Sequence, residues 1–245
     1  MNKELFLNPR FIDQVIEEQD LLVFFHAQRT AGSAFRHILA DAFGKDKVFC
    51  TQYAGEFKHW ELITEEELQE QRVFAGHSNF EEKGWARKLH YTSILRHPVY
   101  RTFSLYYYCQ KYPNQFLHDF AKDKSIEDFY YAASEKKPKY FNNVLCRRIA
   151  GVTDFQSAKK SIEDRFFLIG ATESFSKFVQ QFLASQNLPA QDVPKAKRDV
   201  ERYGELLEKT TLVKDILSNN KEDEKLFRYF NREYFGFDEQ EYPWS

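Results

Sequence analysis

The feature that most constrains the fold is the stretch LLVFFHAQRTAGSAFRHILADAF, which spans residues 21–43. It opens on five consecutive apolar residues, a pattern typical of a strand buried on both faces of a sheet. After a polar turn, apolar residues recur at offsets of three and four from Ser33 onward, and Gly44 stands where a helix would end. The sequence therefore predicts a strand, a loop and a helix in direct succession.

The loop of this unit has the chemistry of an anion site. It leads into the N-terminus of a helix, where unpaired backbone N–H groups and the positive end of the helix dipole attract negative charge. Arg29, Thr30 and Ser33 add donors, while Ala31 and Gly32 keep the loop thin enough for a phosphate to approach the backbone. The Walker A pattern GxxxxGK[ST] is absent. Taken alone, the same residues also fit a purely structural turn.

The remainder of the chain continues the alternation of strands and helices. Short apolar runs predict strands over residues 47–50, 72–77, 91–96 and 165–170, and apolar residues at helical spacing predict helices over residues 8–16, 65–71, 98–107, 125–133, 141–149, 172–183, 212–217 and 226–234. The connection 185–202 shows no such periodicity and has the length of a binding loop. We therefore expect one P-loop-like, three-layer α/β domain over residues 1–245, with a central, mostly parallel sheet of about five strands flanked by helices.

Composition excludes several functional classes. The formal net charge is −2, so the chain lacks the global basic field that marks a nucleic-acid-binding protein. No apolar run reaches the length of about 18 residues that a membrane span needs, so we expect a cytoplasmic protein without a transmembrane segment. Three widely spaced cysteines, Cys50, Cys109 and Cys146, predict reduced thiols rather than a metal site. Any anionic ligand must then be held by local charge, and no metal is expected.

Two further strand ends carry side chains suited to a ligand. One predicted strand ends in His77, and the next ends in Arg96, with Ser104 on the helix that follows. Ligands of parallel sheets bind beyond the carboxyl ends of the strands. This position favours His77 over the other histidines and would let Arg96 and Ser104 hold a phosphate. A lone histidine is also often structural, and Arg96 could equally pair with a carboxylate.

Together these signals resemble the sulfotransferase superfamily, in the branch that includes heparan sulfate 2-O-sulfotransferase and related carbohydrate sulfotransferases. The family motif FFHIPKTGGTS is matched by FFHAQRTAGSA from Phe24, and the motif LRDPVERxxSxY is matched by LRHPVYRTFSLY from Leu95. Weaker matches are the Gly-His pair at 76–77, NNVLCRRIAG before the last predicted strand, GxTE at 170–173 and the closing KEDEKLFRYF. The matches extend over residues 21–235.

This resemblance implies a sulfotransferase that moves a sulfuryl group from 3'-phosphoadenylyl sulfate (PAPS) to a hydroxyl of a carbohydrate, a glycolipid or a small acceptor. It implies that His77 is the general base, that Arg29 lies at the leaving group, and that Arg96 and Ser104 hold the 3'-phosphate. The donor-binding residues implied in this way are Gln28, Arg29, Thr30, Ala31, Gly32, Ser33, Ala34, Arg96, Ser104, Thr172, Glu173, Lys195, Lys197 and Arg198. Acceptor contacts are expected from Glu56, His59 and Tyr107.

The sequence departs from the family pattern at three positions. Arg29 replaces the lysine of the first loop, Ala31 replaces the first glycine of a pair, and His97 replaces the aspartate that follows Arg96. Two alternatives to an active sulfotransferase stay open: a relative that binds PAPS or its product without turnover, and a nucleotide-dependent kinase on a similar sheet. The kinase is disfavoured because GK[ST] and an aspartate placed to bind Mg²⁺ after an apolar strand are both missing.

Overall fold

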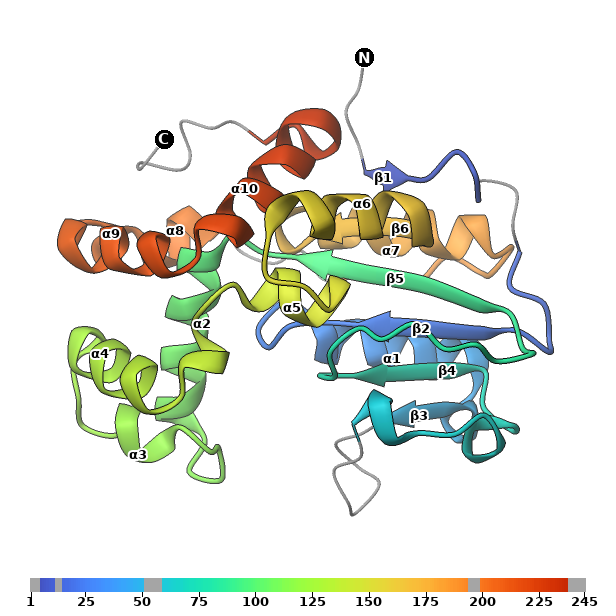
Figure 1. The fold of residues 1–245 in the computed structure, drawn as a ribbon, viewed down its shortest axis with the longest axis horizontal. Coiled ribbons are helices and arrows are strands. Elements are labelled where there is room, and N and C mark those ends of the chain that lie inside the picture. Colours follow the sequence, from blue (N-terminus) through green and yellow to red (C-terminus); the bar gives the residue numbers. More distant parts are fainter. Residues whose placement is uncertain (1–4, 12–14, 51–58, 194–198, 238–245) are drawn as a thin grey trace.

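The structure, a computed structural model, describes residues 5–11, 15–50, 59–193 and 199–237. A six-stranded sheet runs through its centre in the order β1-β6-β5-β2-β4-β3 (Figure 1). Strands β2 to β6 run parallel, whereas β1 pairs antiparallel with β6. The strands are β1 Phe6–Leu7, β2 Leu21–Phe25, β3 Val48–Cys50, β4 Val73–Gly76, β5 Leu89–Leu95 and β6 Phe166–Ala171. The predicted fold class, a mixed α/β fold around a mostly parallel sheet, is confirmed.

The sheet is covered on both faces because its strands carry large apolar side chains on both sides. Neighbouring residues of a strand point to opposite faces, and the ring of Phe24 meets Phe35 at 4.8 Å between centroids while the ring of Phe25 meets Trp60 at 5.5 Å. Phe35 belongs to α1 (Gly32–Phe43), which packs beside α7 (Phe175–Ser185). Figure 1 shows α1 behind the sheet and α5 (Val144–Ala150) and α6 (Phe155–Arg165) in front of it.

A helical part lies beside the carboxyl ends of the strands (Figure 1). Its central helix is α2 (Pro98–Lys111), which leaves the sheet two residues after β5 and packs against α3, α4, α8 and α9. The helix starts there because Pro98 occupies its first position and the imidazole of His97 accepts a hydrogen bond from the N–H of Val99. The remaining helices are α3 His118–Ala121, α4 Ile126–Lys136, α8 Asp199–Leu207, α9 Thr210–Asn219 and α10 Lys221–Phe230.

Local capping signals in the sequence correspond to caps in the structure. Gly44 follows α1 with a φ of 97°, and Gly151 follows α5 with a φ of 71°. Thr64 and Glu67 form a capping box: the N–H of Thr64 donates to Glu67 Oε2 at 3.0 Å and the N–H of Glu67 donates to Thr64 Oγ1 at 3.4 Å. The predicted helix at 65–71 is a single 3₁₀ turn, Glu66–Leu68.

The predicted helix over residues 8–16 is wrong in its described part, since residues 8–11 and 15–16 are not helical. The side-chain amide of Asn8 donates to the carbonyl of Glu163 at 2.7 Å, and its backbone N–H donates to the carbonyl of Phe167 at 2.9 Å. The backbone bond continues the pairing of β1 with β6, and the side-chain bond ties Asn8 to the end of α6. Long-range pairing therefore outweighs the local signal of an asparagine followed by proline.

Three helices are not predicted by the sequence. The helices α3 and α6 fall in stretches without a clear apolar period, although Asp154 caps α6 by accepting a hydrogen bond from the N–H of Ser157 at 2.8 Å. The helix α8 begins at Asp199, inside the connection 185–202 that the sequence leaves without structure. The prediction for this connection is therefore wrong from residue 199 onward.

The described part of the chain contains no helix that is both long and apolar enough to cross a membrane. All three cysteines are free thiols; Cys109 and Cys146 are buried and Cys50 is half-buried. This agrees with the prediction of reduced, partly buried thiols.

Candidate functional site

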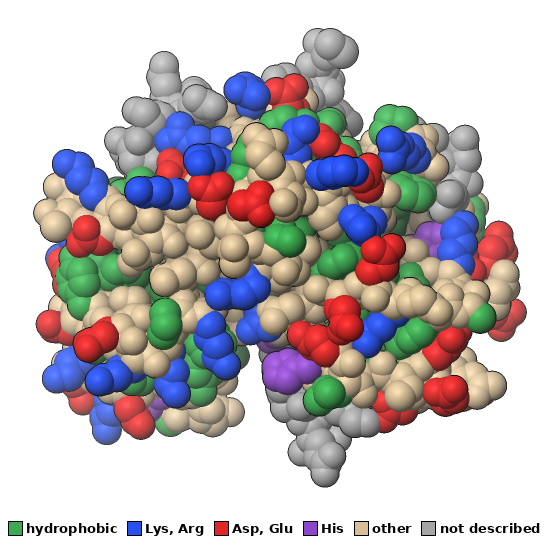
Figure 2. Space-filling view, viewed as in Figure 1, with side chains coloured by type: hydrophobic (Ala, Val, Ile, Leu, Met, Phe, Trp, Pro, Cys, Tyr) green, Lys and Arg blue, Asp and Glu red, His purple; other side chains and the backbone are tan. Residues whose placement is uncertain are grey.

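Four parallel strands end at one large cavity. A residue just beyond the end of each strand contributes to its wall: His26 after β2, His77 after β4, Arg96 after β5 and Thr172 after β6. The cavity has a volume of about 1720 Å³. Figure 2 shows the surface hollowed between the helical part at the left and the sheet at the right, with Lys or Arg side chains and a histidine at the rim. The strand ends thus meet at the edge where parallel sheets bind ligands.

The loop between β2 and α1 forms the centre of the cavity wall. Its backbone is held in the left-handed region at two positions that are not glycine, Arg29 with a φ of 70° and Ala31 with a φ of 59°. Ala31 is the N-cap of α1, and no side chain makes a capping hydrogen bond there. The first N–H groups of the helix, including those of Gly32 and Ser33, therefore face a cavity that can take an anion.

Gly32 is required by the neighbouring ring of His26. A Cβ at position 32 would lie 1.8 Å from His26 Cδ2 and 2.0 Å from its Nε2. The imidazole of His26 also stacks on Phe24, with 4.8 Å between ring centroids and 4° between planes. The ring is therefore pressed against the N-terminus of α1, and only glycine leaves room for it.

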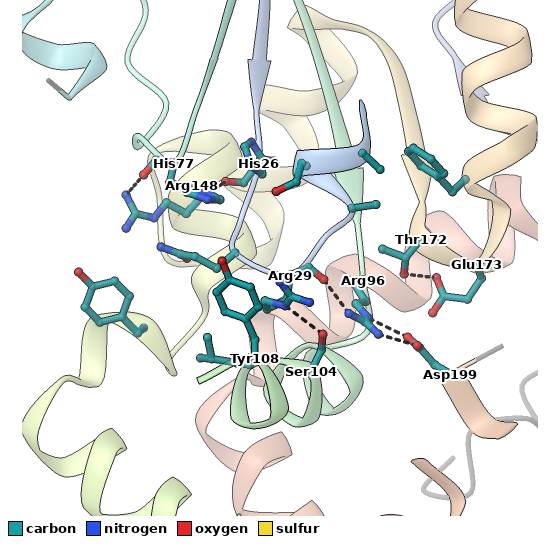
Figure 3. A pocket seen from close by; sticks show the side chains of 18 of the residues that line it. His26, Arg29, His77, Arg96, Ser104, Tyr108, Arg148, Thr172, Glu173 and Asp199 are labelled. Atoms are coloured by element: carbon teal, nitrogen blue, oxygen red, sulfur yellow. Dashed lines mark hydrogen bonds and ion pairs between the residues drawn. The ribbon is translucent and has the colours of Figure 1, made fainter. Parts of the chain in front are cut away.

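Arg29 points from the loop toward α2. Its Nε donates to Ser104 Oγ at 3.1 Å, and its guanidinium lies 4.2 Å above the ring of Tyr108 (Figure 3). Ser104 and Tyr108 are one turn apart on α2, so one helix face supplies both contacts. Burial, together with the nearby charge of Arg96, lowers the pKa of Arg29.

Arg96 is the most fully engaged cation of the cavity. Its Nε and Nη2 donate to the two carboxylate oxygens of Asp199 at 2.7 and 2.5 Å, and its Nη1 donates to the carbonyl of Arg29 at 2.8 Å (Figure 3). Burial would lower the pKa of Arg96, but the Asp199 carboxylate raises it. Beside this pair, burial and the charge of Asp199 raise the pKa of Glu173 to about 7. The hydroxyl of Thr172 donates a hydrogen bond to Glu173 Oε2 at 2.9 Å.

His77 lies on the other side of the loop and is half-buried. Its Nδ1 is 3.1 Å from the carbonyl oxygen of His26. A carbonyl can only accept, so Nδ1 carries the proton and Nε2 is the basic nitrogen. Burial, and after it the charge of Arg148, lowers the pKa of His77 to about 4, whereas the bond to His26 opposes this shift. His77 is therefore neutral at physiological pH.

Arg148 holds the end of β4 in place from α5. Its Nη1 donates to the carbonyl of His77 at 2.5 Å, and only 7% of the residue is exposed (Figure 3). Its Nε is buried and has no hydrogen-bond partner among the described residues. Arg148 thus places a positive charge in the cavity wall next to the basic imidazole.

The outer part of this side of the cavity is aromatic and cationic. Phe116 is 49% exposed, and its ring centroid lies 4.4 Å from that of Tyr140. Lys139 and Arg147 line the cavity beside these rings, and Arg147 donates to the carbonyls of Lys139 and Asn142. This wall combines flat apolar surfaces with positive charge.

The structure brings most of the sequence-predicted residues to this cavity. The predicted residues that line it are Gln28, Arg29, Ala31, Gly32, Ser33, Ala34, His59, His77, Arg96, Ser104, Thr172 and Glu173. Two other predicted residues, Thr30 and Tyr107, do not line the cavity. The hydroxyl of Thr30 donates to the carbonyl of Ala27 at 3.0 Å, and the ring of Tyr107 stacks on Tyr203 with 5.9 Å between centroids. Glu56, Lys195, Lys197 and Arg198 lie outside the described residues.

The wall residues that sequence reasoning missed include His26, Tyr108, Arg148 and Asp199. Tyr108 could have been found, because it lies one helical turn beyond Ser104. His26 directly follows the first strand and could have been found by the strand-end argument that selected His77. Arg148 and Asp199 have no local signal, since their partners are 71 and 103 residues away in sequence.

No protein-family model matches the chain, and no curated protein matches it. Among solved structures, it is similar to mouse sulfotransferase SULT7A1 complexed with PAP, with 14% identity over 75% of this chain and 64% of that chain and a TM-score of 0.41. It is also similar to a sulfotransferase from Alicyclobacillus acidocaldarius, with 12% identity over 81% of this chain and 93% of that chain and a TM-score of 0.44. This chain spans less than two thirds of the mouse chain. Similarities this low assign neither a family nor an activity.

Proposed function

We propose that the protein is a PAPS-dependent sulfotransferase, which transfers a sulfuryl group to a hydroxyl of a carbohydrate or glycolipid and releases 3'-phosphoadenosine 5'-phosphate (PAP). The observation that carries the proposal is the presence of two complementary sets of groups in one cavity. Arg29, Arg96 and Ser104 lie together beside the open N-terminus of α1, and a neutral His77 lies beside Arg148 (Figure 3). The first set suits a nucleotide with two phosphates, and the second suits a base at an acceptor hydroxyl.

The donor would lie across the loop between β2 and α1. Its phosphosulfate would take hydrogen bonds from the first N–H groups of α1 and from Arg29, and its 3'-phosphate from Arg96 and Ser104. This assignment is supported by the link between the two arginines, since Arg96 Nη1 donates to the Arg29 carbonyl at 2.8 Å. Thr172 and Glu173 are proposed for the adenine side, and Lys195, Lys197 and Arg198 for a loop over the nucleotide.

The chemistry asks little of the protein beyond positioning and charge neutralisation. An O–S bond forms to the acceptor oxygen while the S–O bond to the leaving phosphate breaks, in line, through a loose transition state of the kind known for phosphoryl transfer. His77 Nε2 takes the proton of the acceptor hydroxyl, a contribution of about 10²- to 10⁴-fold. Arg29 and the N–H groups of α1 stabilise the negative charge that develops on the leaving phosphate.

The acceptor would occupy the side of the cavity that holds His77. Phe116 and Tyr140 offer flat apolar surfaces on which a sugar ring can pack. The positive charge of Arg148 in the cavity wall favours an acceptor that also carries a carboxylate, sulfate or phosphate group. His59 lines the same cavity, and we propose that it also contacts the acceptor.

A thermal-shift series with PAP, ATP and ATP plus Mg²⁺ tests the proposal, because a ligand that binds the native state raises its apparent stability. We expect PAP to raise the melting temperature without magnesium and to do so more than ATP. Stabilisation by ATP and Mg²⁺ without stabilisation by PAP would indicate the kinase. Stabilisation by PAP with no transfer of labelled sulfate to any glycan or glycolipid acceptor would indicate a binding protein without turnover.

A further inference from the structure

The guanidinium of Arg96 makes the same pattern of bonds to Asp199 that arginine makes to a phosphate. Two parallel bonds, from Nε and Nη2, hold the two oxygens of the carboxylate at 2.7 and 2.5 Å. A forked pair of this kind is how arginine holds both carboxylates and phosphates. A carboxylate of the chain therefore occupies the edge of Arg96 that a 3'-phosphate would use.

All three nitrogens of the Arg96 guanidinium already donate within the protein, and its forked edge is fully used by Asp199. The third group, Nη1, donates to the carbonyl of Arg29, and the pair with Asp199 is buried, with 8% and 9% of the two side chains exposed. Ser104, the other residue proposed for this phosphate, already accepts a hydrogen bond from Arg29 at 3.1 Å. Arg96 is thus engaged by a competing carboxylate, whereas the hydroxyl of Ser104 can still donate its hydrogen to a phosphate.

Charge adds to this conflict. A phosphate at Arg96 would bring negative charge against the carboxylate of Asp199 in a poorly hydrated site, where like charges repel strongly. Glu173 is a second carboxyl group in the same place, and Asp199 contributes to raising its pKa to about 7, after burial. A phosphate at Arg96 would therefore share this arginine with two carboxyl groups.

Asp199 is placed where it can leave while its helix stays. It is the first residue of α8, and first turns of helices are the parts that open most easily. One turn further, the buried Tyr203 packs against Phe103 of α2, with 6.0 Å between ring centroids. The body of α8 is therefore anchored to α2 by Tyr203, whose ring also lies 5.9 Å from the Arg96 guanidinium.

We infer that Asp199 competes with the 3'-phosphate of the nucleotide for Arg96, so that nucleotides with a 3'-phosphate bind only when Asp199 has released this arginine. The inference rests on the proposed function, because it takes Arg96 as the 3'-phosphate ligand. Its consequence is a specificity effect: the apparent affinity for a 3'-phosphorylated nucleotide is reduced by the fraction of molecules in which the pair is closed. The affinity for a nucleotide without the 3'-phosphate is not reduced in this way.

The test compares two nucleotides on two proteins by isothermal titration calorimetry. We expect Asp199→Asn to bind PAP about tenfold more tightly than the wild type, because a like charge is removed, and to bind adenosine 5'-monophosphate as the wild type does. Asp199→Ala follows the same course and excludes a residual amide bond to Arg96. Glu205→Gln, which removes an exposed carboxylate from the same helix, controls for net charge and should leave both affinities unchanged.

The outcomes separate the two proposals. Weaker or unchanged PAP binding in folded Asp199→Asn and Asp199→Ala overturns the inference and makes Asp199 a positioning residue for Arg96. Equal tightening for both nucleotides also overturns it, since the effect would not depend on the 3'-phosphate. If neither nucleotide binds the wild type or the variants, while all of them melt cooperatively, the proposed function fails and the inference falls with it.

Discussion

His77 differs from a surface histidine in its protonation and in its tautomer. Burial keeps the ring neutral, with a pKa of about 4, and the His26 carbonyl fixes the proton on Nδ1. A base in this state is ready to accept a proton at neutral pH without first losing one. The cost is a lower basicity, which fits a reaction in which bond formation to sulfur acidifies the hydroxyl as it loses its proton.

Replacing His77 with alanine should reduce sulfate transfer by about 10²- to 10⁴-fold while PAP binding stays within error of the wild type. Transfer of labelled sulfate and calorimetry with PAP measure the two effects. His37→Ala, at an exposed position of α1, is the control. In the wild type, the acid limb of kcat/KM should lie near pH 4; a limb near pH 6.5, or an active His77→Ala variant, would contradict the role of a neutral base.

Ala31 carries a backbone conformation that suits glycine. Its φ of 59° and ψ of 14° lie in the left-handed region, which costs an L-residue about 1–2 kcal/mol. Ala31→Gly should therefore raise the free energy of unfolding by about 0.5–1 kcal/mol, after the entropy that glycine costs on folding. Ala34→Gly is the matched control: this exposed residue lies in the first turn of α1, and the variant should be destabilised by up to about 1 kcal/mol. Urea denaturation measures both, and destabilisation of Ala31→Gly would show that the loop is not strained there.

At the scale of elements, the short helix α5 is held by a carboxylate from another helix. Asp223 of α10 is fully buried and accepts hydrogen bonds from the N–H groups of Leu145 and Cys146 at 2.7 and 2.9 Å. Burial raises the pKa of this carboxyl group, although the two N–H groups oppose the shift. Helix α5 also carries Arg148, so the cap that Asp223 of α10 provides for α5 also positions part of the cavity wall.

Asp223→Ala should lower the free energy of unfolding by about 3 kcal/mol, because two buried N–H groups and the nearby buried Arg101 lose their acceptor or counter-charge. Asp154→Ala removes the exposed cap of α6 and should cost only about 1 kcal/mol. Urea denaturation of the two variants gives the comparison. Similar losses for both would mean that α5 does not depend on its long-range cap.

The elements differ in how far the sequence predicts them. The unit from β2 to α1 is predicted because its strand, turn and helix each follow from residues close together in sequence. The ends at Gly44 and Gly151 are likewise local. Asn8 shows the opposite case, because its helix-capping signal is overruled by bonds to residues more than 150 positions away. Proximity of this kind depends on which strands become neighbours, and no local period encodes that order.

The same distinction applies to the candidate site. Arg29 and Ser33 lie on one local turn, and Arg96 and Ser104 on one strand end and helix, so the motifs that carry them could be read directly. Asp199 was hidden in a connection without apolar periodicity. Its role is visible only once Asp199 meets Arg96, 103 residues away in sequence, which makes the engaged state of Arg96 a property of the tertiary structure.

At the scale of the whole molecule, packing aromatic rings on both faces of the sheet also buries imidazoles. His26, His90 and His97 are buried and His77 is half-buried, and burial is the largest cause that lowers the pKa of each. At His90, the hydrogen bond and the charge of Asp20 oppose this lowering of the pKa. In the unfolded chain these groups return to a pKa of about 6.5. The folded protein therefore binds fewer protons than the unfolded chain as the pH falls below about 6.5.

The protein should lose stability as the pH falls from 7.5 to 5. Stability follows the difference in bound protons, so each of the four histidines contributes a loss of up to about 1.4 kcal/mol per pH unit. Glu173, with its pKa raised to about 7, and Asp223, whose pKa burial also raises, act in the opposite direction, but they are two groups against four. Urea unfolding at pH 7.5, 6.5 and 5.5 measures the slope. His97→Asn keeps a capping acceptor for α2 but cannot titrate, so stability should fall less steeply with pH in this variant. His37→Asn, the control, should show the slope of the wild type. A wild-type stability that is flat or rises toward pH 5.5 would mean that the buried imidazoles take up protons in the native state.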